Sequence, residues 1–552
     1  MLKPSRIKFD FWFFVLIISI GLVGLFLVYP LWQLLETGFR DQRTNELTMA
    51  NFDRFFRTPF FFRMFRNSMS VSILATLFGS FIGVTLAYLT TAFKIRGKKI
   101  VDVLIIISML SPPFLGSYSW ILMFGRAGFV TRFFANNFGI TVPPIFGFQG
   151  IVLVMTLSSF PLIYLFTRGA LKKVDASIIE AAESLGCRPF KKAFTIIFPL
   201  ITPTILAASL LGFMDAFTDF GTPLLIGQGF MVMPLQVFNT FMGDMAGNRN
   251  FGAAIAVIMV VITTILFALQ KYIVNRKSYA MSSLRPIQPD NLKPLPNFLA
   301  HGFVYLITII ASIPQIVVIT TSFRATRGPI FVEGFSLDSY RGTFRTLGTA
   351  VRNTYVYAVY AIVIILALAL LFSYLTVRRR NPLTNVLDTI TMLPFVIPGS
   401  IVGIILILSF NQRPLLLIGT PAIMILAFVI RRLPFTLRSS SAILQQISPS
   451  MEEAAISLGD TPMKAFFKVT AIMMIPGVVS GAILSWITII NELSSTILLF
   501  TVRTRTMTVA IFHTIMSGDF GVAAALATIL TATTVVSLMV FFKLTGKTDL
   551  SL

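Results

Sequence analysis

One polar motif occurs twice in this chain, and each copy begins with an acidic side chain that could bind a partner. Residues 180–194 read EAAESLGCRPFKKAF, and residues 453–467 read EAAISLGDTPMKAFF, which is an offset of 273 residues. A single copy would suit a well-capped loop packed under its own helices. Two copies favour a paired partner surface, because a packing loop has little physical reason to keep a polar face through a duplication that changed most other residues.

Three carboxylates lie within stretches that are otherwise apolar. Asp219 and Glu492 are separated by the same 273 residues, and Asp215 precedes Asp219 by one helical turn, while the counterpart of Asp215 is Thr488. A carboxylate in hydrocarbon costs at least ~2.5 kcal/mol, so these acids are candidates for a transport pathway. They could form an acidic ring that attracts a cation and repels a phosphate. Alternatively, Asp219 and Glu492 could cap the turns that follow them.

Residue types for catalysis and metal binding are scarce. The chain has one cysteine, Cys187, and two histidines, His301 and His513, which excludes an internal disulfide and a Cys/His metal cluster of the usual kind. The sequence has no catalytic triad, no phosphate-binding G-x-x-x-x-G-K-[ST] motif and no repeated acidic metal motif. We therefore expect no enzyme activity, no metal site and no cofactor in this chain.

The composition is that of a membrane protein. Hydrophobic residues make up 55% of the chain and charged residues only 12%, and the mean hydropathy is +0.84. Runs of about 20 apolar residues, enough to cross a ~30 Å hydrocarbon core, occur about six times in each half. The first is too long for a signal-peptide core and lacks a cleavage motif, so we expect it to be retained. The expected spans lie near 11–35, 67–93, 100–124, 149–167, 200–226, 251–274, 301–322, 353–377, 386–410, 420–437, 473–500 and 520–544.

The net charge of +23 follows the expected topology. With the N-terminus inside, the alternating loops place every lysine on the cytoplasmic side, whereas the opposite loops contain arginine but no lysine. An excess of Lys and Arg in cytoplasmic loops is the ordinary pattern of polytopic proteins, so the charge does not indicate nucleic-acid binding. Both termini are therefore expected in the cytoplasm.

The two halves of the chain are copies of each other. Asn67 corresponds to Asn353 at an offset of 286 residues, and Phe251 corresponds to Phe520 at an offset of 269. Because each half contains an even number of spans, the halves are parallel copies with pseudo-twofold symmetry about the membrane normal. The predicted fold is an all-α polytopic membrane protein with about 12 transmembrane helices in two six-helix repeats. Its expected domains are a first half (1–274), a cytoplasmic linker (275–300) and a second half (301–552).

Each motif copy predicts a helix, a sharp turn and a second helix. Gly186 and Gly459 follow helix-forming residues and suit a C′ position with positive φ. Pro189 and Pro462 suit the first turn of the next helix. The loops that contain the two copies are expected at residues 168–199 and 438–472.

The repeated motif resembles the signature loop of the membrane subunits of binding-protein-dependent ABC importers. The first copy matches through Glu180, Ala181, Ala182, Gly186, Phe194, Pro199 and Pro203. The second copy matches through Glu453, Ala454, Ala455, Gly459, Phe467 and Pro476. The second copy has Ile472 where the first has Pro199, which predicts a different end for the helix downstream. The resemblance covers nearly the entire chain, as two permease-like halves in one polypeptide.

The resemblance implies that several proteins work together. Each motif loop would form a coupling helix docked on one of two ABC ATPase subunits, with Glu180 and Glu453 in polar contact with them. ATP and Mg²⁺ would be bound by those ATPases, and this chain would be the channel in the bacterial inner membrane. An extracytoplasmic binding protein would deliver the substrate. The outer loops 36–66 and 323–351 would be its docking surfaces, or simply amphipathic lids.

Two further segments bear on the cargo. FTDFGTPLLIG (217–227) and NELSSTILLF (491–500) resemble those of fused two-half permeases for ferric iron and of their relatives for phosphonates, organophosphates such as phosphorylated sugars, thiamine and polyamines. The segments do not separate these substrates, and ferric iron is the cargo we expect first. A secondary transporter of the major facilitator type also has twelve spans in two parallel halves. The doubled cytoplasmic motif argues against that class, which uses no ATPase partner.

Overall fold

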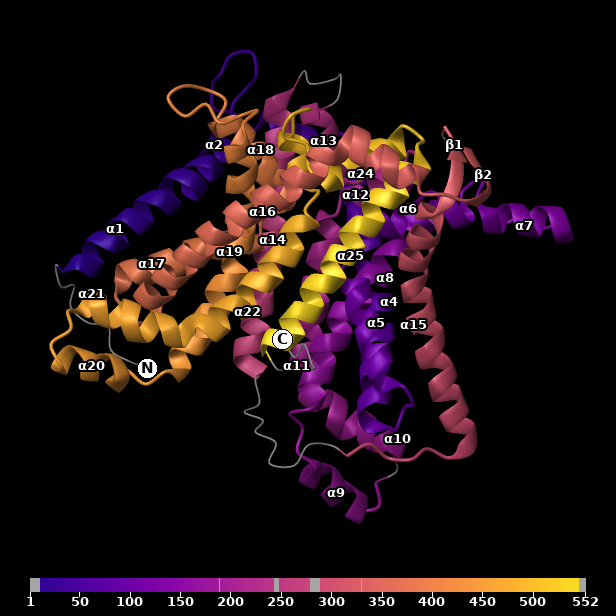
Figure 1. Ribbon diagram of the computed structural model, residues 1–552, viewed down its shortest axis with the longest axis horizontal. Helices are drawn as coiled ribbons and strands as arrows, with labels where there is room; N and C mark the ends of the chain where they lie inside the picture. Colours follow the sequence, from indigo (N-terminus) through magenta and orange to yellow (C-terminus); the bar gives the residue numbers. More distant parts are fainter. Residues whose placement is uncertain (1–9, 188, 243–247, 278–287, 329, 546–552) are drawn as a thin grey trace. The chain divides into compact units, whose positions relative to one another are not determined.

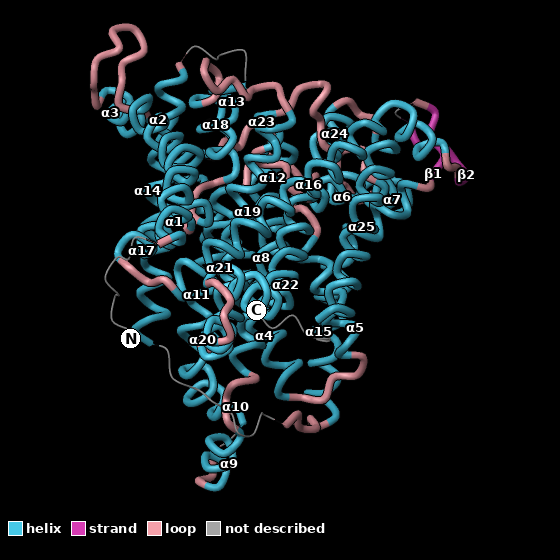
Figure 2. The backbone as a smooth tube through the Cα atoms, turned by 60° about the vertical axis from the view of Figure 1, so that its left-hand side comes forward, coloured by secondary structure: helices cyan, strands magenta, loops and turns pink. Residues whose placement is uncertain are grey.

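The fold is almost entirely helical. The computed structural model describes residues 10–187, 189–242, 248–277, 288–328 and 330–545. Within these ranges one two-stranded antiparallel sheet is formed by β1 (Arg324–Arg327) and β2 (Ile330–Phe335), in a hairpin that pairs Arg327 with Ile330 (Figure 2). This agrees with the predicted all-α membrane fold, apart from the hairpin.

Nine helical stretches among the described residues are long and apolar enough to cross a membrane. Most of them consist of one helix, and three contain a π-helical turn, η1, η2 or η4. Each overlaps an expected span, but the fifth span of each half ends earlier than expected, at Thr218 and Ile490 in place of 226 and 500. They are α1–η1–α2 (Phe11–Gly38), α4 (Pro59–Ala92), α8 (Phe148–Leu171), η2–α11 (Ala193–Thr218), α14 (Arg249–Lys277), α15 (Pro294–Ser322), α16 (Asp338–Arg378), α21–η4–α22 (Pro462–Ile490) and α25 (Phe520–Thr545).

Three of the twelve expected spans differ from a straight apolar helix. The third span of each half is broken. After α5 (Lys98–Leu110) the chain bends by 99° into the stretch Pro113–Phe138, which begins with α6 (Pro113–Phe124). In the second half α17 (Pro382–Thr391) with the short 3₁₀ turn η3 (Leu393–Phe395) meets α18 (Gly399–Ser409) at 113°. Proline accounts for both breaks, because Pro112 and Pro398 lie where the helix would need their missing N–H groups. The remaining span, α19 (Pro421–Gln446), contains three arginines and is too polar to join the nine.

Shorter helices connect the spans. Near the expected outer ends are α3 (Ala50–Arg57), α7 (Phe129–Phe138), α12 (Gly221–Ile226), α13 (Met233–Met242), α23 (Thr496–Leu499) and α24 (Met507–Met516). The motif loops contain α9 (Ala176–Ser184), α10 (Pro189–Lys192), α20 (Ser450–Ser457) and α21 (Pro462–Ala465).

The chain forms two compact units that do not coincide with its two sequence halves. The N-half unit contains the described parts of 54–236 and 261–323, and the C-half unit contains those of 10–53, 237–260 and 324–545. The first span, α1–α2, therefore packs with α17 and α18 of the second half. Reciprocally, α15 packs against α5 and α6 of the first half (Figure 1). Each half thus contributes its first span to the unit built from the other half.

The linker between the halves is shorter than expected. α14 ends at Lys277 and α15 begins at Pro294, so the expected boundary at residue 301 lies inside a helix, and residues 278–287 lie outside the described ranges. Asp290 is fixed to the end of α4, because its N–H donates to the Ala92 carbonyl at 2.9 Å and its carbonyl accepts from Lys94 N–H at 3.0 Å. The last part of the linker is therefore an ordered component of the N-half unit.

The same three-helix arrangement forms the centre of each unit. In the N-half unit α4, α8 and α11 pack together, and Gly83 lies so close to α8 that an added Cβ would come within 2.8 Å of the Phe160 carbonyl oxygen. In the C-half unit α16, α19 and α22 pack together, and a Cβ on Gly481 would lie 2.8 Å from Thr436 Cα. Small residues let membrane helices approach closely, which explains the glycines at these crossings.

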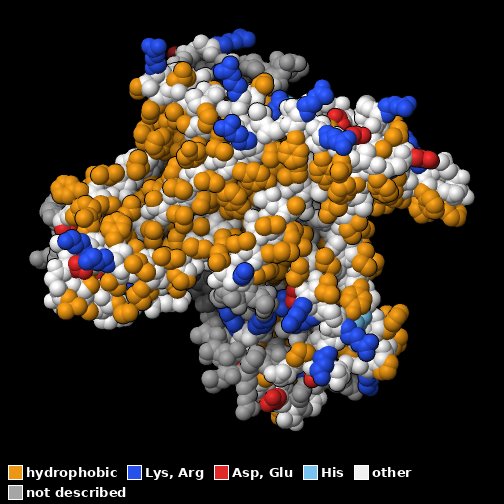
Figure 3. Space-filling view, viewed as in Figure 1, with side chains coloured by type: hydrophobic (Ala, Val, Ile, Leu, Met, Phe, Trp, Pro, Cys, Tyr) orange, Lys and Arg blue, Asp and Glu red, His pale blue; other side chains and the backbone are white. Residues whose placement is uncertain are grey.

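The lipid-facing character of the C-half unit is visible on its surface. Along α1, α16, α19 and α25 the visible side chains are mostly hydrophobic, and Lys and Arg lie toward the helix ends (Figure 3). Exposed aliphatic and aromatic side chains on these helices, such as Ile18, Tyr360 and Val536, would be costly in water but are favourable in hydrocarbon.

Candidate functional site

Both copies of the repeated motif form the predicted helix, turn and helix. Gly186 and Gly459 have φ of +76° and +99°, the left-handed conformation that a side chain would strain. The N–H of Cys187 donates to the Ala182 carbonyl at 3.0 Å, and that of Asp460 donates to the Ala455 carbonyl at 3.1 Å, which is the Schellman pattern of a helix end. α10 and α21 then begin at Pro189 and Pro462, as predicted.

The two motif helices expose equivalent side chains. Glu180 and Glu453 are both exposed, and their backbone carbonyls accept from Ser184 Oγ at 3.0 Å and from Ser457 Oγ at 2.9 Å. At the end of each helix a leucine side chain is almost fully exposed: Leu185 is 88% exposed and Leu458 is 90% exposed. The first alanine of each motif, Ala181 or Ala454, is exposed, whereas Ala182 is buried and Ala455 half-buried. Each loop therefore presents an acid, a small residue and an uncovered leucine to its surroundings.

The two motif loops are attached to their units in different ways. In the second copy Glu452 accepts from the Tyr374 hydroxyl at 2.5 Å and from Thr470 Oγ1 at 2.9 Å. The Tyr374 ring packs on Trp12 and Phe466, with ring centroids 4.3 Å and 4.6 Å away. In the first copy the residue equivalent to Glu452 is the buried Ile179. We did not predict this attachment of the loop through Glu452. The sequence could have indicated it, because the second copy has Glu452–Glu453 where the first copy has Ile179–Glu180.

We expect Tyr374→Phe to loosen α20 without changing the exposed face of the motif. The substitution removes a hydrogen bond to a carboxylate, which contributes about 1.5–3 kcal/mol. Hydrogen exchange at the α20 amides should accelerate by about tenfold or more. Tyr360→Phe on the same helix is the matched control, because Tyr360 is exposed. Equal exchange rates in both variants would remove Glu452 from its anchoring role.

A π-helical turn follows each motif at the same place. η2 covers Ala193–Ile197 and η4 covers Phe466–Thr470, again an offset of 273 residues. α11 and α22 then begin at equivalent residues, Phe198 and Ala471, and end within one residue of equivalence. The expectation that Ile472 changes the end of the downstream helix is therefore wrong, because a helix tolerates either residue in its first turn. The π-helical turns were not predicted, since no local residue pattern specifies them.

The paired acids in the spans lie in equivalent turns and accept backbone hydrogen bonds there. Asp219 ends α11, and its Oδ1 accepts from Gly221 N–H at 2.9 Å. Glu492 follows α22, and its Oε1 accepts from Ser495 N–H at 3.2 Å. Asp215, one turn earlier, is exposed. These contacts fit the capping interpretation of Asp219 and Glu492, whereas a role in the transport pathway stays a prediction.

Glu492 also forms two buried ion pairs that were not predicted. Its carboxylate bonds to the guanidinium groups of both Arg431 and Arg432 on α19. The Glu492 side chain is 2% exposed and the two arginine side chains 18% and 16%, so the cluster is largely removed from solvent. The equivalent positions in the first half are Ser158 and Ser159. The two halves thus differ in charge at these equivalent positions. The two consecutive arginines in an apolar stretch of the sequence could have indicated the cluster.

A second buried charge pair lies in the N-half unit. Arg168 Nη1 on α8 lies 2.7 Å from Asp102 Oδ1 on α5, and the Tyr164 hydroxyl donates to the same oxygen at 2.5 Å. Thr90 Oγ1 lies 3.3 Å from the Tyr164 hydroxyl. The Asp102 carboxylate contacts both a guanidinium and a hydroxyl of α8, so this cluster ties the first part of the broken third span to α8. It had not been predicted either.

Within the described ranges no three Cys, His, Asp or Glu side chains gather closely enough to hold a metal ion. Cys187 lies in the first motif loop and is half-buried, His301 bonds to Asn297 in α15, and His513 packs on Phe500. The predicted site residues that lie exposed as equivalent pairs are therefore those of the two motif loops, each within its own unit.

Comparison with known proteins shows that both motif loops lie within segments that match a family of transport proteins. The family model described as "Binding-protein-dependent transport system inner membrane component" matches residues 75–279 and 365–545. The chain is 28% identical over 546 residues to a ferric transport system permease protein of Actinobacillus pleuropneumoniae, covering 96% of this chain and 77% of that protein. It is 24% identical over 525 residues to an Fe(3+)-transport system permease protein of Haemophilus influenzae, covering 94% and 96%.

Two further matches cover only part of the chain. A molybdenum transport system permease protein of Escherichia coli is 33% identical over 157 residues, which is 28% of this chain and 68% of that protein. Among solved structures, a bacterial ABC transporter involved in the import of the polysaccharide alginate covers 48% of this chain and 96% of its own, with a TM-score of 0.41 and 16% identity.

Proposed function

Because this chain belongs to the family of binding-protein-dependent transport system inner membrane components, we propose that it is the channel subunit of an ATP-driven importer of ferric iron. Family membership applies to both halves, since the matched segments lie in each of them. It makes the chain a multi-span transport subunit of the bacterial inner membrane and removes the secondary-transporter alternative. The observation that supports the proposal most directly is the motif that each half exposes.

In the proposed importer the two motif loops are the docking sites of two ATPase copies. Glu180 and Glu453 would make the polar contacts, and the bare Leu185 and Leu458 would enter apolar clefts of the ATPases. Burying a leucine side chain stabilises a complex by about 1.5–3 kcal/mol. ATP and Mg²⁺ would be bound by the ATPases, and this chain would need no cofactor of its own.

Ferric iron is the proposed cargo because two relatives that align with more than 90% of this chain are named for it. A phosphonate, an organophosphate, thiamine or a polyamine remains the alternative from the sequence. In the importer an extracytoplasmic binding protein would supply the specificity. Its docking surface would include the outer loops 36–66 and 323–351, which contain α3 and the β1–β2 hairpin.

Uptake by the reconstituted complex tests the cargo. The chain, its ATPase and its binding protein would be incorporated into liposomes loaded with ATP, and accumulation of radioactive iron would be followed. We expect uptake that needs ATP and the binding protein, together with no accumulation of a labelled phosphonate. Iron-independent ATPase stimulation, with accumulation of the phosphonate instead, would contradict ferric iron while leaving the importer proposal intact.

The proposed orientation places both termini and both motif loops in the cytoplasm. We expect single cysteines at Asn45 and Ser336, in a Cys187→Ser background, to react with a membrane-impermeant reagent in intact spheroplasts. Cysteines at Ser184 and Ser457, both exposed in the motif loops, should react only after permeabilisation. The pairs serve as controls for each other, and the reverse pattern would show that the lysine distribution had been misinterpreted.

A further inference from the structure

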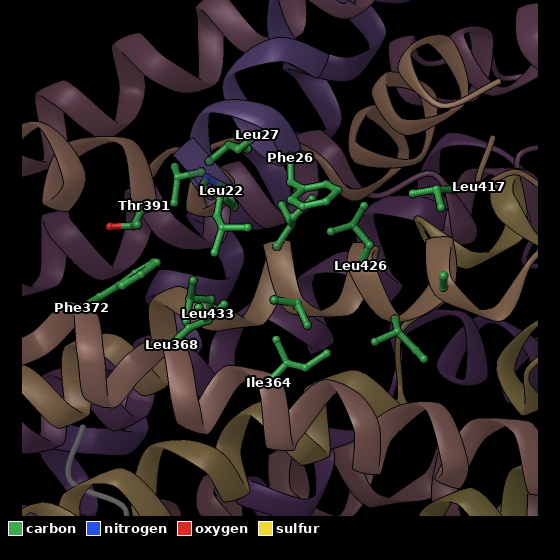
Figure 4. A pocket seen from close by; sticks show the side chains of 16 residues that line it. Leu22, Phe26, Leu27, Ile364, Leu368, Phe372, Thr391, Leu417, Leu426 and Leu433 are labelled. Atoms are coloured by element: carbon green, nitrogen blue, oxygen red, sulfur yellow. The ribbon is translucent and has the colours of Figure 1, made fainter. Parts of the chain in front are cut away.

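The C-half unit contains an apolar pocket of 470 Å³ between the first span and helices of the second half. Side chains from the first span, α16 and α19 converge on it (Figure 4). Its walls include Leu22, Phe26, Leu368, Phe372, Leu426 and Leu433. The pocket is partly open to the surroundings, and Leu22 and Ile364 on its wall are each about two-fifths exposed, at 42% and 41%.

The chemistry of the wall excludes a polar occupant. Thr391 is the one residue with a polar side chain among those that line the pocket. Its hydroxyl donates to the Leu387 carbonyl at 2.8 Å and to the Asp388 carbonyl at 3.0 Å, so it is satisfied within its own helix. A water molecule or an ion needs two to four polar partners, and the wall offers none. The pocket therefore suits a hydrocarbon.

The position of the pocket along the first span matches one leaflet of a bilayer. Leu22 lies ten residues before Trp32 in a helical stretch, which is about 15 Å at 1.5 Å per residue. This is half of a ~30 Å hydrocarbon core. Tyr29 is 41% exposed and Trp32 63% exposed, and such aromatic side chains are enriched at the headgroup level. A chain descending from that level would reach Leu22 near the midplane.

The helix of the first span is irregular where it lines this pocket. Its π-helical turn η1 (Gly24–Val28) contains Phe26 and Leu27 of the pocket wall. π-helical turns are rare and occur frequently at functional sites. The Phe26 ring also lies 5.8 Å from the Phe410 ring, so the turn is held in place by packing. The irregular helix and the pocket therefore form one structural feature.

We propose that this pocket binds one acyl chain of a bilayer phospholipid from the leaflet that contains Trp32. The bilayer hydrocarbon surrounds the spanning helices, and the pocket continues their lipid-facing surface inward. The bound chain would fill the space between the first span and α16 and α19, and it would contribute to holding the first span on the unit of the other half. The inference does not depend on the identity of the cargo.

Photocrosslinking in the full chain tests the proposal. The protein would be reconstituted in bilayers of phosphatidylethanolamine and phosphatidylglycerol that contain a phosphatidylglycerol with a diazirine in its acyl chain. Loosely held lipid would be removed by detergent exchange before illumination, and adducts would be mapped by mass spectrometry. Leu368→Trp and Leu426→Trp would fill the pocket. Val363→Trp is the matched control, because Val363 lies on α16, is 59% exposed and is not part of the wall.

We expect the lipid in the pocket to survive the detergent exchange and to form adducts on Leu22–Leu27 and on the pocket face of α16. Displacing about two methylene groups should lower their yield by about tenfold in the filled variants and leave it unchanged in Val363→Trp. Should the tryptophan variants fail to fold, Ala422→Leu fills less of the same pocket. Adducts spread equally over the wall and over exposed residues such as Ile309 would overturn the proposal. Undiminished adducts in filled variants that melt like the wild type would overturn it as well.

Discussion

Replacing both Glu180 and Glu453 by lysine is expected to abolish uptake and to release the ATPase from the membrane. Both carboxylates are exposed on short helices whose ends carry an uncovered leucine, so reversing their charge changes the docking face without touching the interior. Like charges placed against each other at an interface cost several kcal/mol, and two such sites would act together. Copurification of the ATPase and iron uptake would be measured at matched expression.

The single variants and the surrounding residues provide the controls for this experiment. Glu180→Lys alone should weaken ATPase binding less than the pair, because the second loop still docks. Ser184→Ala and Ser457→Ala remove only the hydrogen bonds to the Glu180 and Glu453 carbonyls and should leave uptake close to that of the wild type. Normal transport by a well-expressed double-lysine variant would remove the coupling role from both loops.

Glu492→Gln is expected to destabilise the C-half unit strongly. The substitution leaves Arg431 and Arg432 without the carboxylate that both guanidinium groups contact. Removing one partner of a buried ion pair costs about 3–5 kcal/mol, because the remaining charge stays buried without compensation. The melting temperature of the purified protein should therefore fall well below that of the wild type. The acidic-ring hypothesis makes a different prediction. It expects Asp219→Asn with Glu492→Gln to slow cation uptake more than it lowers stability.

Two comparisons separate the ion-pair role from a pathway role. Asp219→Asn should lower the melting temperature only slightly, since an asparagine oxygen can still accept from Gly221 N–H. The triple variant Arg431→Met, Arg432→Leu, Glu492→Met should recover much of the lost stability, because an apolar replacement of a buried ion cluster is often neutral or stabilising. A Glu492→Gln protein that melts like the wild type and has lost uptake would support the acidic ring instead.

Features determined by short stretches of sequence could be predicted, and features determined by long-range contacts could not. Span positions follow from the length of apolar chain that a bilayer requires, and the turns at Gly186 and Gly459 follow from local backbone preference. The pairing of Glu492 with Arg431 joins residues 61 positions apart, which no local pattern specifies. The sequence also did not indicate which helices pack on the first span, because apolar helix faces resemble one another in composition.

The breaks in the third spans could be predicted only in part from the sequence. Pro112 and Pro398 were present in the sequence, but a proline in an apolar run is compatible with a kink, a break or a continuous helix. In the N-half unit the proline allows a break, and the long-range contact of Asp102 with Arg168 on α8 fixes α5 while the stretch Pro113–Phe138 departs at 99°. Hydropathy alone therefore located the two apolar stretches and did not predict the bend within each of them.

The exchange of first spans has a consequence for biosynthesis. α2 ends at Gly38 and α16 begins at Asp338, so the ribosome must add about 300 residues before it reaches the first of the second-half helices that pack on the first span, α16, α17 and α18. At about 5–20 residues per second this takes roughly 15–60 s. During that interval the face containing Leu22 and Phe26 is solvated by lipid, and the nascent chain cannot complete either unit. A ribosome that stalls near the linker would therefore leave a half-protein whose first span lacks its partners from the second half, and such a product is a natural substrate for membrane quality-control proteases.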